Sequence, residues 1–204
     1  MALRMPRAPG ATVSIRNRLA IFHETAVNAE MACAMEECEI TFDLFMRNGV
    51  KATNLIVAGI GPTALKARGV HSAHQLRQLG YDALHLCDPD FCNEASMAYG
   101  AGPVVNAFLA SAQDAVALAG TEAMHILNVK PTQLLEQCAG YPGEAVAVLQ
   151  QLPQAVSLQN VPCVVLLDAG LRAETLKAAG YGLVTIISQV GPTGAELAKL
   201  GYTL

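Results

Sequence analysis

Aromatic and charged side chains are scarce in this sequence of 204 residues. It contains no Trp, only 5% of its residues are aromatic and only 15% are charged, whereas 52% are hydrophobic. Soluble domains commonly carry about 25% charged residues, so this composition is unusually apolar. The core must be built from Ala, Leu and Val, and we expect part of the apolar surface to be covered by another protein subunit.

An excess of positive charge is also absent. The chain has 13 Lys and Arg against 17 Asp and Glu, which gives a net charge of −4 at pH 7. This balance argues against nucleic acid or an anionic membrane as the main partner. The first 23 residues contain no acid, and they include Arg4, Arg7, Arg16 and Arg18. We interpret residues 1–13 as a basic N-terminal arm that interacts with an acidic body.

No long hydrophobic stretch runs without interruption. The uncharged run 145–167 is long enough to cross a bilayer, but Gln, Asn and Pro residues interrupt it, so we expect no membrane span. The start of the chain lacks the apolar segment of a secretory signal. The six Cys are spread along a chain that is large enough to fold without disulfides. These features predict an intracellular protein with reduced thiols, in the cytoplasm or an organelle interior.

Glycine, by contrast, recurs in a short motif, seen in "ALKARGVH", "QLRQLGYD", "TLKAAGYG" and "ELAKLGYT". An apolar residue stands four positions before each Gly, and successive Gly residues are ten or eleven apart wherever the units adjoin. Such regular spacing indicates an internal repeat. The pairs are Phe45 with Gly49, Leu55 with Gly59, Leu65 with Gly69, Leu76 with Gly80, Val116 with Gly120, Leu166 with Gly170, Leu176 with Gly180, Ile187 with Gly191 and Leu197 with Gly201, and Leu86 with Asp90 is a degenerate unit.

This spacing is typical of helix ends. A Gly just past a helix adopts a left-handed conformation at little cost, and the residue four before it then contacts the residue that follows it. Each unit therefore predicts a helix of about six or seven residues, which is stable only when it packs on its neighbours. Candidate N-caps are Thr53, Thr63, Ser72, Thr132 and Thr193. The segments 163–170 and 181–188 are rich in β-branched residues, but the same Gly spacing favours helices over strands there.

The fold predicted for residues 49–204 is thus all-α. We expect an array of short helices in tandem repeats of 10–11 residues, arranged as a solenoid or as a compact bundle. Residues 14–48 contain neither Gly nor Pro, and apolar residues recur there every three or four positions. They predict a long amphipathic helix, or two in series, that ends at Gly49 and caps the array or pairs with its copy in a second subunit.

One segment, "AGIGPTALKARGV", resembles the helix-hairpin-helix family of nucleic-acid-binding proteins from residue 58 to about residue 79. The resemblance implies that the turn at Gly59 and Gly61 directs backbone amides toward phosphate, with Lys66 and Arg68 adding positive charge. The Ala and Leu that follow "GIG" are one residue out of register, and the repeat alone explains both Gly residues. Nucleic-acid binding, with the arginines of the arm contributing, is therefore the alternative function.

Metal binding or catalysis is a second alternative. Potential ligands gather between residues 71 and 92, namely His71, His74, His85, Cys87 and Cys92. Zinc sites usually contain closely spaced ligand pairs, and only His71 and His74 are spaced in that way. Asp90 is more simply explained as a substitute for Gly in the left-handed position. The chain has neither a nucleophile elbow nor a phosphate-binding loop, and we expect no cofactor.

The main functional prediction is a non-enzymatic structural or scaffold subunit. It would mediate protein–protein interaction in a homo-oligomer or a larger complex, with the chain itself as one partner. The repeat accounts for nearly every distinctive residue, and the composition is low in charge for a monomer. Candidate interaction residues are Arg4, Arg7, Arg16 and Arg18 in the arm and Met31, Met35 and Phe42 in the predicted helix.

Overall fold

A computed structural model describes residues 41–153 and 157–202, and these residues form helices without any strand. The helices are short, and most contain six to eight residues. They are α3 (Phe42–Arg47), α4 (Ala52–Val57), α5 (Pro62–Ala67), α6 (Ala73–Gln78), α7 (Ala83–Leu86), α8 (Pro89–Tyr99), α9 (Ala101–Phe108), α10 (Ala112–Leu118), α11 (Glu122–Ile126), α12 (Pro131–Gln137), α13 (Pro142–Gln151), α14 (Cys163–Asp168), α15 (Ala173–Ala178), α16 (Leu183–Val190) and α17 (Gly194–Leu200). The β-branched segments near residues 163 and 183 are therefore helical, as predicted.

Seven of the nine predicted Gly pairs end a helix with the expected geometry. At Gly69 the backbone φ is 82°, and the amide of Val70 donates to the carbonyl oxygen of Leu65 at 3.1 Å. This is the six-residue hydrogen bond of a Schellman ending. The same bond runs from Val50 to Phe45, Ile60 to Leu55, Tyr81 to Leu76, Leu171 to Leu166, Tyr181 to Leu176 and Tyr202 to Leu197. The predicted helix ends are confirmed at these seven positions.

Two of the predicted pairs do not form such an ending. Helix α10 already ends at Leu118, before Gly120 is reached. At Gly191 the following residue is Pro192, which has no amide hydrogen to donate, so only the bond from Gly191 to Ile187 remains. Ile187, the apolar residue paired with Gly191, is 48% exposed, and helix α16 buries Ile186 in its place.

The prediction for Asp90 is wrong. Asp90 lies in the first turn of α8, whose N-cap is Asp88. Outside Gly, the left-handed positions of the described chain belong to Asn128 and Asn160. At Asn128 the following amide of Val129 donates to the carbonyl oxygen of Met124 at 2.8 Å, so Asn replaces Gly in a Schellman ending.

The helix starts agree with the sequence only in part. Ser72 and Thr193 are N-caps whose hydroxyls accept hydrogen bonds from backbone amides. Thr53, Thr63 and Thr132 instead lie inside α4, α5 and α12, one residue after the first helical position. Pro at the first position of α5 and α12 already fixes the entry into those helices.

The predicted long helix over residues 14–48 falls mostly outside the described residues. Its last part is described, and there Thr41 has extended backbone angles (φ −109°, ψ 167°) and acts as the N-cap of α3. A single helix that continues unbroken to residue 48 is therefore corrected to a six-residue helix that begins at Phe42. The end of this helix at Gly49 is as predicted.

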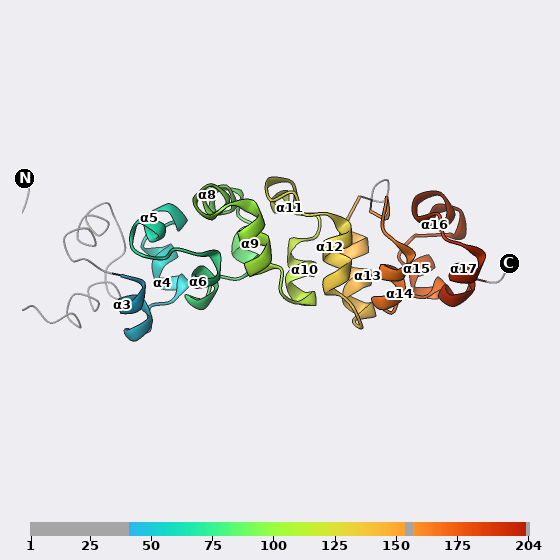
Figure 1. Cartoon of the computed structure of the whole chain (residues 1–204), viewed down its shortest axis with the longest axis horizontal. Helices are drawn as coiled ribbons and strands as arrows, with labels where there is room; N and C mark the ends of the chain where they lie inside the picture. The colour runs from blue at the N-terminus through green and yellow to red at the C-terminus, as the bar shows by residue number, and fades with distance from the viewer. Residues whose placement is uncertain (1–40, 154–156, 203–204) are drawn as a thin grey trace, which may run out of the picture.

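The helices stack into an elongated body with α3 at one end and α17 at the other (Figure 1). Helix α5 packs on α8 and α8 on α11, α6 packs on α9, α7 on α10 and α10 on α13, and α12 packs on α14 and α14 on α17. Four of the polar contacts between stacked helices join residues 30 to 32 positions apart. That separation equals three units of ten or eleven residues.

The core runs along the whole stack as one cluster of apolar side chains. Each unit contributes side chains at recurring positions, as Val70, Ala73, Leu76 and Leu79 illustrate, all of which are at most 1% exposed. Replacing one such buried Leu by Ala typically costs about 2–5 kcal/mol. In the described part of the chain, no helix has both the length and the apolar character needed to cross a membrane.

One row of helices is interrupted. Helices α5, α8, α11 and α16 follow one another along one edge of the molecule in Figure 1, and we call this row the edge column. Between α11 and α16, where the next unit would supply a helix, lies the connection between α13 and α14. Its described residues, 152–153 and 157–162, form no helix. Within the described residues, no helix occupies the edge column between α11 and α16.

Candidate functional site

The "GIG" turn is occupied by a carboxylate of the same chain. Gly59 ends α4 with φ 60°, as in the other units, and Gly61 is the N-cap of α5. The amide of Thr63 donates to Glu94 Oε1 of α8 at 2.8 Å. A Cβ atom built on Gly61 would lie only 2.1 Å from Glu94 Oε2. Glu94 thus takes the position at which a phosphate would be held.

The basic residues next to this turn also contribute to packing. Lys66 donates from Nζ to the carbonyl oxygen of Ala98, and its Nζ lies 5.7 Å from the centre of the Tyr99 ring. Arg68 is half-buried at the C-cap of α5. The structure brings Gly59, Gly61 and Lys66 to the interface of α4, α5 and α8, and this arrangement does not favour the nucleic-acid alternative.

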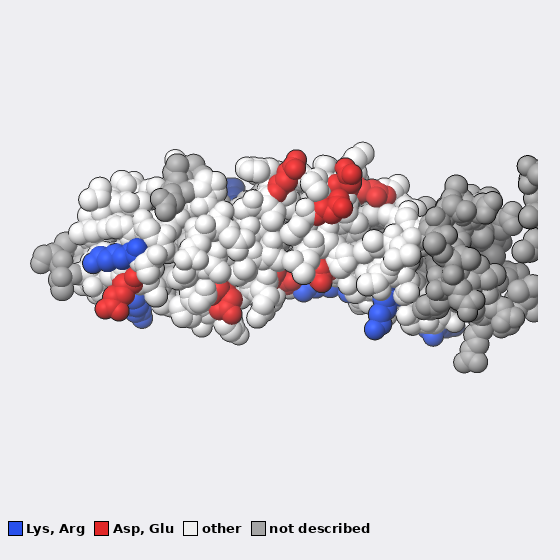
Figure 2. Space-filling model, turned by 180° about the vertical axis from the view of Figure 1, so that it is seen from behind, with Lys and Arg blue, Asp and Glu red and all other residues white. Residues whose placement is uncertain are grey.

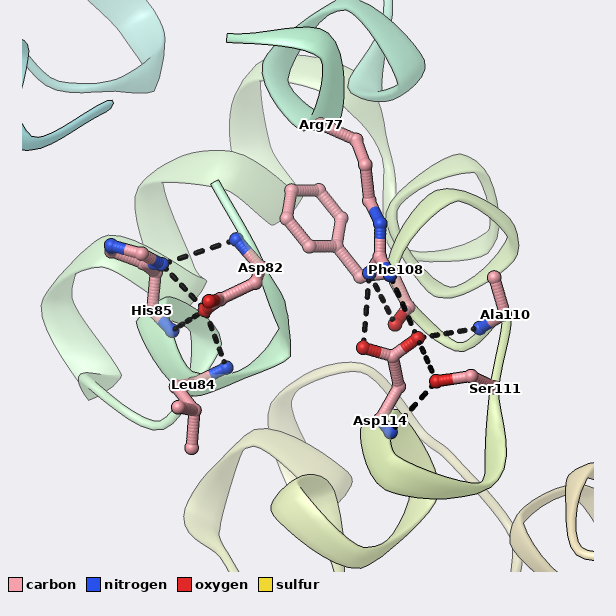
Figure 3. A network of polar contacts seen from close by, with 8 residues as sticks. All are labelled: Arg77, Asp82, Leu84, His85, Phe108, Ala110, Ser111 and Asp114. Atoms are coloured by element: carbon pink, nitrogen blue, oxygen red, sulfur yellow. Dashed lines mark hydrogen bonds and ion pairs between the residues drawn. The ribbon is translucent and has the colours of Figure 1, made fainter. Parts of the chain in front are cut away.

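The structure does not assemble the candidate metal ligands. In the part of the chain that the structure describes, no group of three or more His, Cys, Asp or Glu side chains is arranged to hold a metal ion. His71 and His74 are exposed and line an open cavity of about 360 Å³. His85 Nδ1 lies 2.7 Å from the carboxylate of Asp82, the N-cap of α7 (Figure 3).

The cysteines of this region are buried or half-buried thiols. The Sγ atom of Cys87 donates to the carbonyl oxygen of Ala117 at 3.3 Å. Burial raises the pKa of Cys92 and of Cys138 to about 11, and it also raises the pKa of Cys87 and Cys163. Because the thiolate is the nucleophile and the metal ligand, these four thiols are not activated at neutral pH.

An ion pair that sequence reasoning missed joins α6 to α10 (Figure 3). Arg77 donates from Nη1 and Nη2 to the two carboxylate oxygens of Asp114 at 3.1 and 2.9 Å, and Nη1 also donates to the carbonyl oxygen of Phe108. Asp114 is only 7% exposed and also accepts from the hydroxyl of Ser111 and the amide of Ala110. The two partners are 37 positions apart, so no local pattern reveals them.

Most of the predicted interaction residues lie outside the described part of the chain. These are Arg4, Arg7, Arg16, Arg18, Met31 and Met35. Phe42, the first residue of α3, is half-buried and packs against the core. The described residues therefore leave the interaction prediction untested, and at Phe42 they show only a contribution to the fold.

A second cavity, of about 540 Å³, lies beside the interruption of the edge column, between α11, the start of α12 and the non-helical connection. It is larger than the cavity beside His71 and His74. Its lining consists of Gly120, Thr121, Met124, His125, Val129, Lys130, Pro131, Thr132, Leu152, Pro153, Ser157, Gln159 and Asn160. The only sequence signal for it is the break in Gly spacing between residues 143 and 170.

Comparison with known proteins gives no family to which the chain can be assigned. No protein-family model, no curated protein and no solved structure matches it. Function must therefore be argued from the residues and geometry described above.

Proposed function

We propose that this chain is a non-enzymatic structural or scaffold subunit that binds other proteins, copies of itself included, in a homo-oligomer or a larger complex. The observation that carries the proposal is the elongated stack of short helices (Figure 1). Stacked helical units provide a large surface for their mass, and proteins of this architecture commonly use that surface to bind partners.

The regular architecture is part of the proposal. We infer a tandem-repeat solenoid in which three units of ten or eleven residues complete one turn. The separation of 30 to 32 residues between polar partners supports this arrangement, and so do the helix pairs that stack three units apart.

The polar side chains are used for structural hydrogen bonds, and this favours a scaffold function over an enzymatic one. Charged side chains that could serve in catalysis, such as those of Glu94, Arg77 and Asp82, instead form hydrogen bonds with backbone amides or carbonyl groups. They cap helices and join successive turns. A catalytic site, by contrast, requires titratable groups that converge on a cleft and remain available to substrate.

The surface also supports protein binding. Figure 2 shows that uncharged residues cover most of one face of the described molecule. Several large apolar side chains are more than half exposed, namely Val57, Leu84, Met97, Tyr141, Val164 and Val184. Aromatic and Met side chains of this kind are enriched in interfaces.

An intracellular location belongs to the same proposal. The four cysteines in the described part of the chain are free thiols. Buried thiols of this type are compatible with a reducing compartment.

The test is the absolute mass of the full chain in solution, measured by light scattering after size exclusion over a dilution series. Concentration is best taken from refractive index, because the chain has no Trp. We expect a mass at least twice the 21.4 kDa of one chain, preserved on dilution. A mass of one chain at every concentration would contradict self-assembly and leave only foreign protein partners.

A further inference from the structure

We propose that the cavity beside α11 is a binding site for a small apolar carboxylate, meaning an organic anion with a hydrocarbon body. The inference goes beyond the scaffold function, and it holds whether or not the chain assembles. It rests on where the cavity lies, on the apolar surface at its floor, and on the charge of its lining.

The cavity arises from the interrupted edge column. Helix α8 packs on α5 and α11 packs on α8, but the described residues of the next connection, 152–153 and 157–162, supply no helix to stack on α11. The end of α13 closes one side, because a Cβ atom built on Gly120 would lie 2.5 Å from the carbonyl oxygen of Gln151. The remaining space is about 540 Å³, within the range of about 300–1,000 Å³ that is typical of small-molecule sites.

The floor of the cavity is apolar and fixed. Val129 and Leu152 are 7% and 5% exposed, and both belong to the apolar core while they also line the cavity. Met124 is half-buried beside them, and its flexible thioether adapts to ligands of different shape. Ser157 is fully buried, and its hydroxyl is hydrogen-bonded to the hydroxyl of Tyr181. The connection is thereby held against the next turn of the stack.

The rim favours an anion. The lining includes the ammonium group of Lys130, the ring of His125 and the amide groups of Gln159 and Asn160, but no Asp or Glu. This is notable because acidic residues outnumber basic ones in the chain by 17 to 13. The hydroxyl of Thr121 already donates its hydrogen to the carbonyl oxygen of Leu118, so it can only accept a hydrogen bond from a ligand. Cationic and amide donors over an apolar floor fit a carboxylate with a hydrocarbon body.

Lys130 is the residue that distinguishes an anion from a neutral ligand. It is the N-cap of α12, and its backbone amide donates to Gln133 Oε1 at 2.8 Å. The backbone at the cavity edge is thus fixed while the exposed side chain remains free to turn toward a ligand.

The test uses the full chain and two matched probes, naphthalene-2-carboxylate and its neutral analogue 2-naphthamide. Their fluorescence can be followed directly, since the chain has no Trp. We expect saturable binding of the carboxylate with one site per chain, and about tenfold weaker binding of the amide. Lys130→Gln should weaken carboxylate binding about five- to tenfold and leave amide binding unchanged. Lys177→Gln, which removes a charge over the Tyr202 ring far along the chain, is the matched control and should change neither.

A second variant fills the cavity. Thr132→Phe places a ring at a lining position at the start of α12, and Thr63→Phe makes the same change at the equivalent exposed position of α5. We expect Thr132→Phe to abolish binding of both probes and Thr63→Phe to preserve it, with circular dichroism confirming that each variant is folded. The proposal is overturned if the carboxylate does not bind at millimolar concentration. It is equally overturned if both probes bind alike, or if neither Lys130→Gln nor Thr132→Phe alters binding.

Discussion

At the scale of single residues, Arg77 combines an ion pair, a hydrogen bond to a carbonyl oxygen and a ring contact. It bridges α6 to the end of α9 and to α10 through Phe108 and Asp114, and its guanidinium lies 5.9 Å from the centre of the Phe108 ring. Asp114 is buried, so it depends on Arg77 for charge compensation. A carboxylate that loses its partner in such a position destabilises the folded state.

We therefore expect Arg77→Met to lower the free energy of unfolding by about 2–3 kcal/mol, a value reduced from that of fully buried pairs because Arg77 is partly exposed. Urea unfolding followed by circular dichroism measures the change. Adding Asp114→Asn to Arg77→Met should recover part of the loss, because the double variant buries no charge. Lys177→Met is the control on an exposed cation, and an equal loss in that variant would show that the Arg77 pair has no special role.

The limits of sequence reasoning are clearest for this pair. The Gly spacing in the sequence predicts which positions are buried, and Leu76 is buried as expected. The ion-pair partner of Arg77 depends instead on how α10, four helices later, is placed, and this is set by the packing angles of the intervening helices. Nothing within a ten-residue window contains that information. The same holds for Glu94, whose carboxylate reaches the turn at Gly61 from 33 residues away along the chain.

At the scale of elements, the ends of the helices are the part of the fold that is determined by residues close together in the sequence. A left-handed residue, the buried apolar residue four before it and the one after it suffice to end a helix, and all three are visible in the sequence. Two of the misses have equally local causes. Pro192 lacks the amide that a Schellman ending needs, and Asn128 takes the Gly position between Met124 and Val129, so a search for Gly does not find it.

This account predicts a specific cost for Gly80→Ala. Gly80 has a φ of 94°, yet the nearest atom to an added Cβ, the backbone nitrogen of Ala52, is 3.9 Å away. The change therefore creates backbone strain without a clash, and we expect the free energy of unfolding to fall by about 1–2 kcal/mol.

Gly143→Ala is the matched control for this prediction. Gly143 lies inside α13, has no positive φ and has open space around its Cβ position. Substitution there should be neutral or stabilise by up to about 1 kcal/mol. Thermal and urea unfolding of both variants measure the difference, and equal effects would refute the role assigned to the left-handed Gly residues.

At the scale of the whole molecule, successive turns of the stack are joined by a recurring contact. Lys66, Arg77 and Cys87 each follow the buried Leu of their unit, and each donates to a carbonyl oxygen one turn later, in Ala98, Phe108 and Ala117 respectively. The three donors differ in chemistry but occupy the same position of the unit. Contacts between neighbouring turns thus stabilise the array, as expected for a quasi-one-dimensional protein.

The central claim is that these contacts hold the chain as an elongated stack and not as a compact globule. Small-angle X-ray scattering, recorded directly after size exclusion with the mass measured on the same peak, tests it most directly. We predict a rod-like signal, with a cross-section that stays constant with concentration and a pair-distance distribution with a long tail. A symmetric, bell-shaped distribution with a radius of gyration near that of a compact 204-residue globule, about 17 Å per chain, would contradict the account.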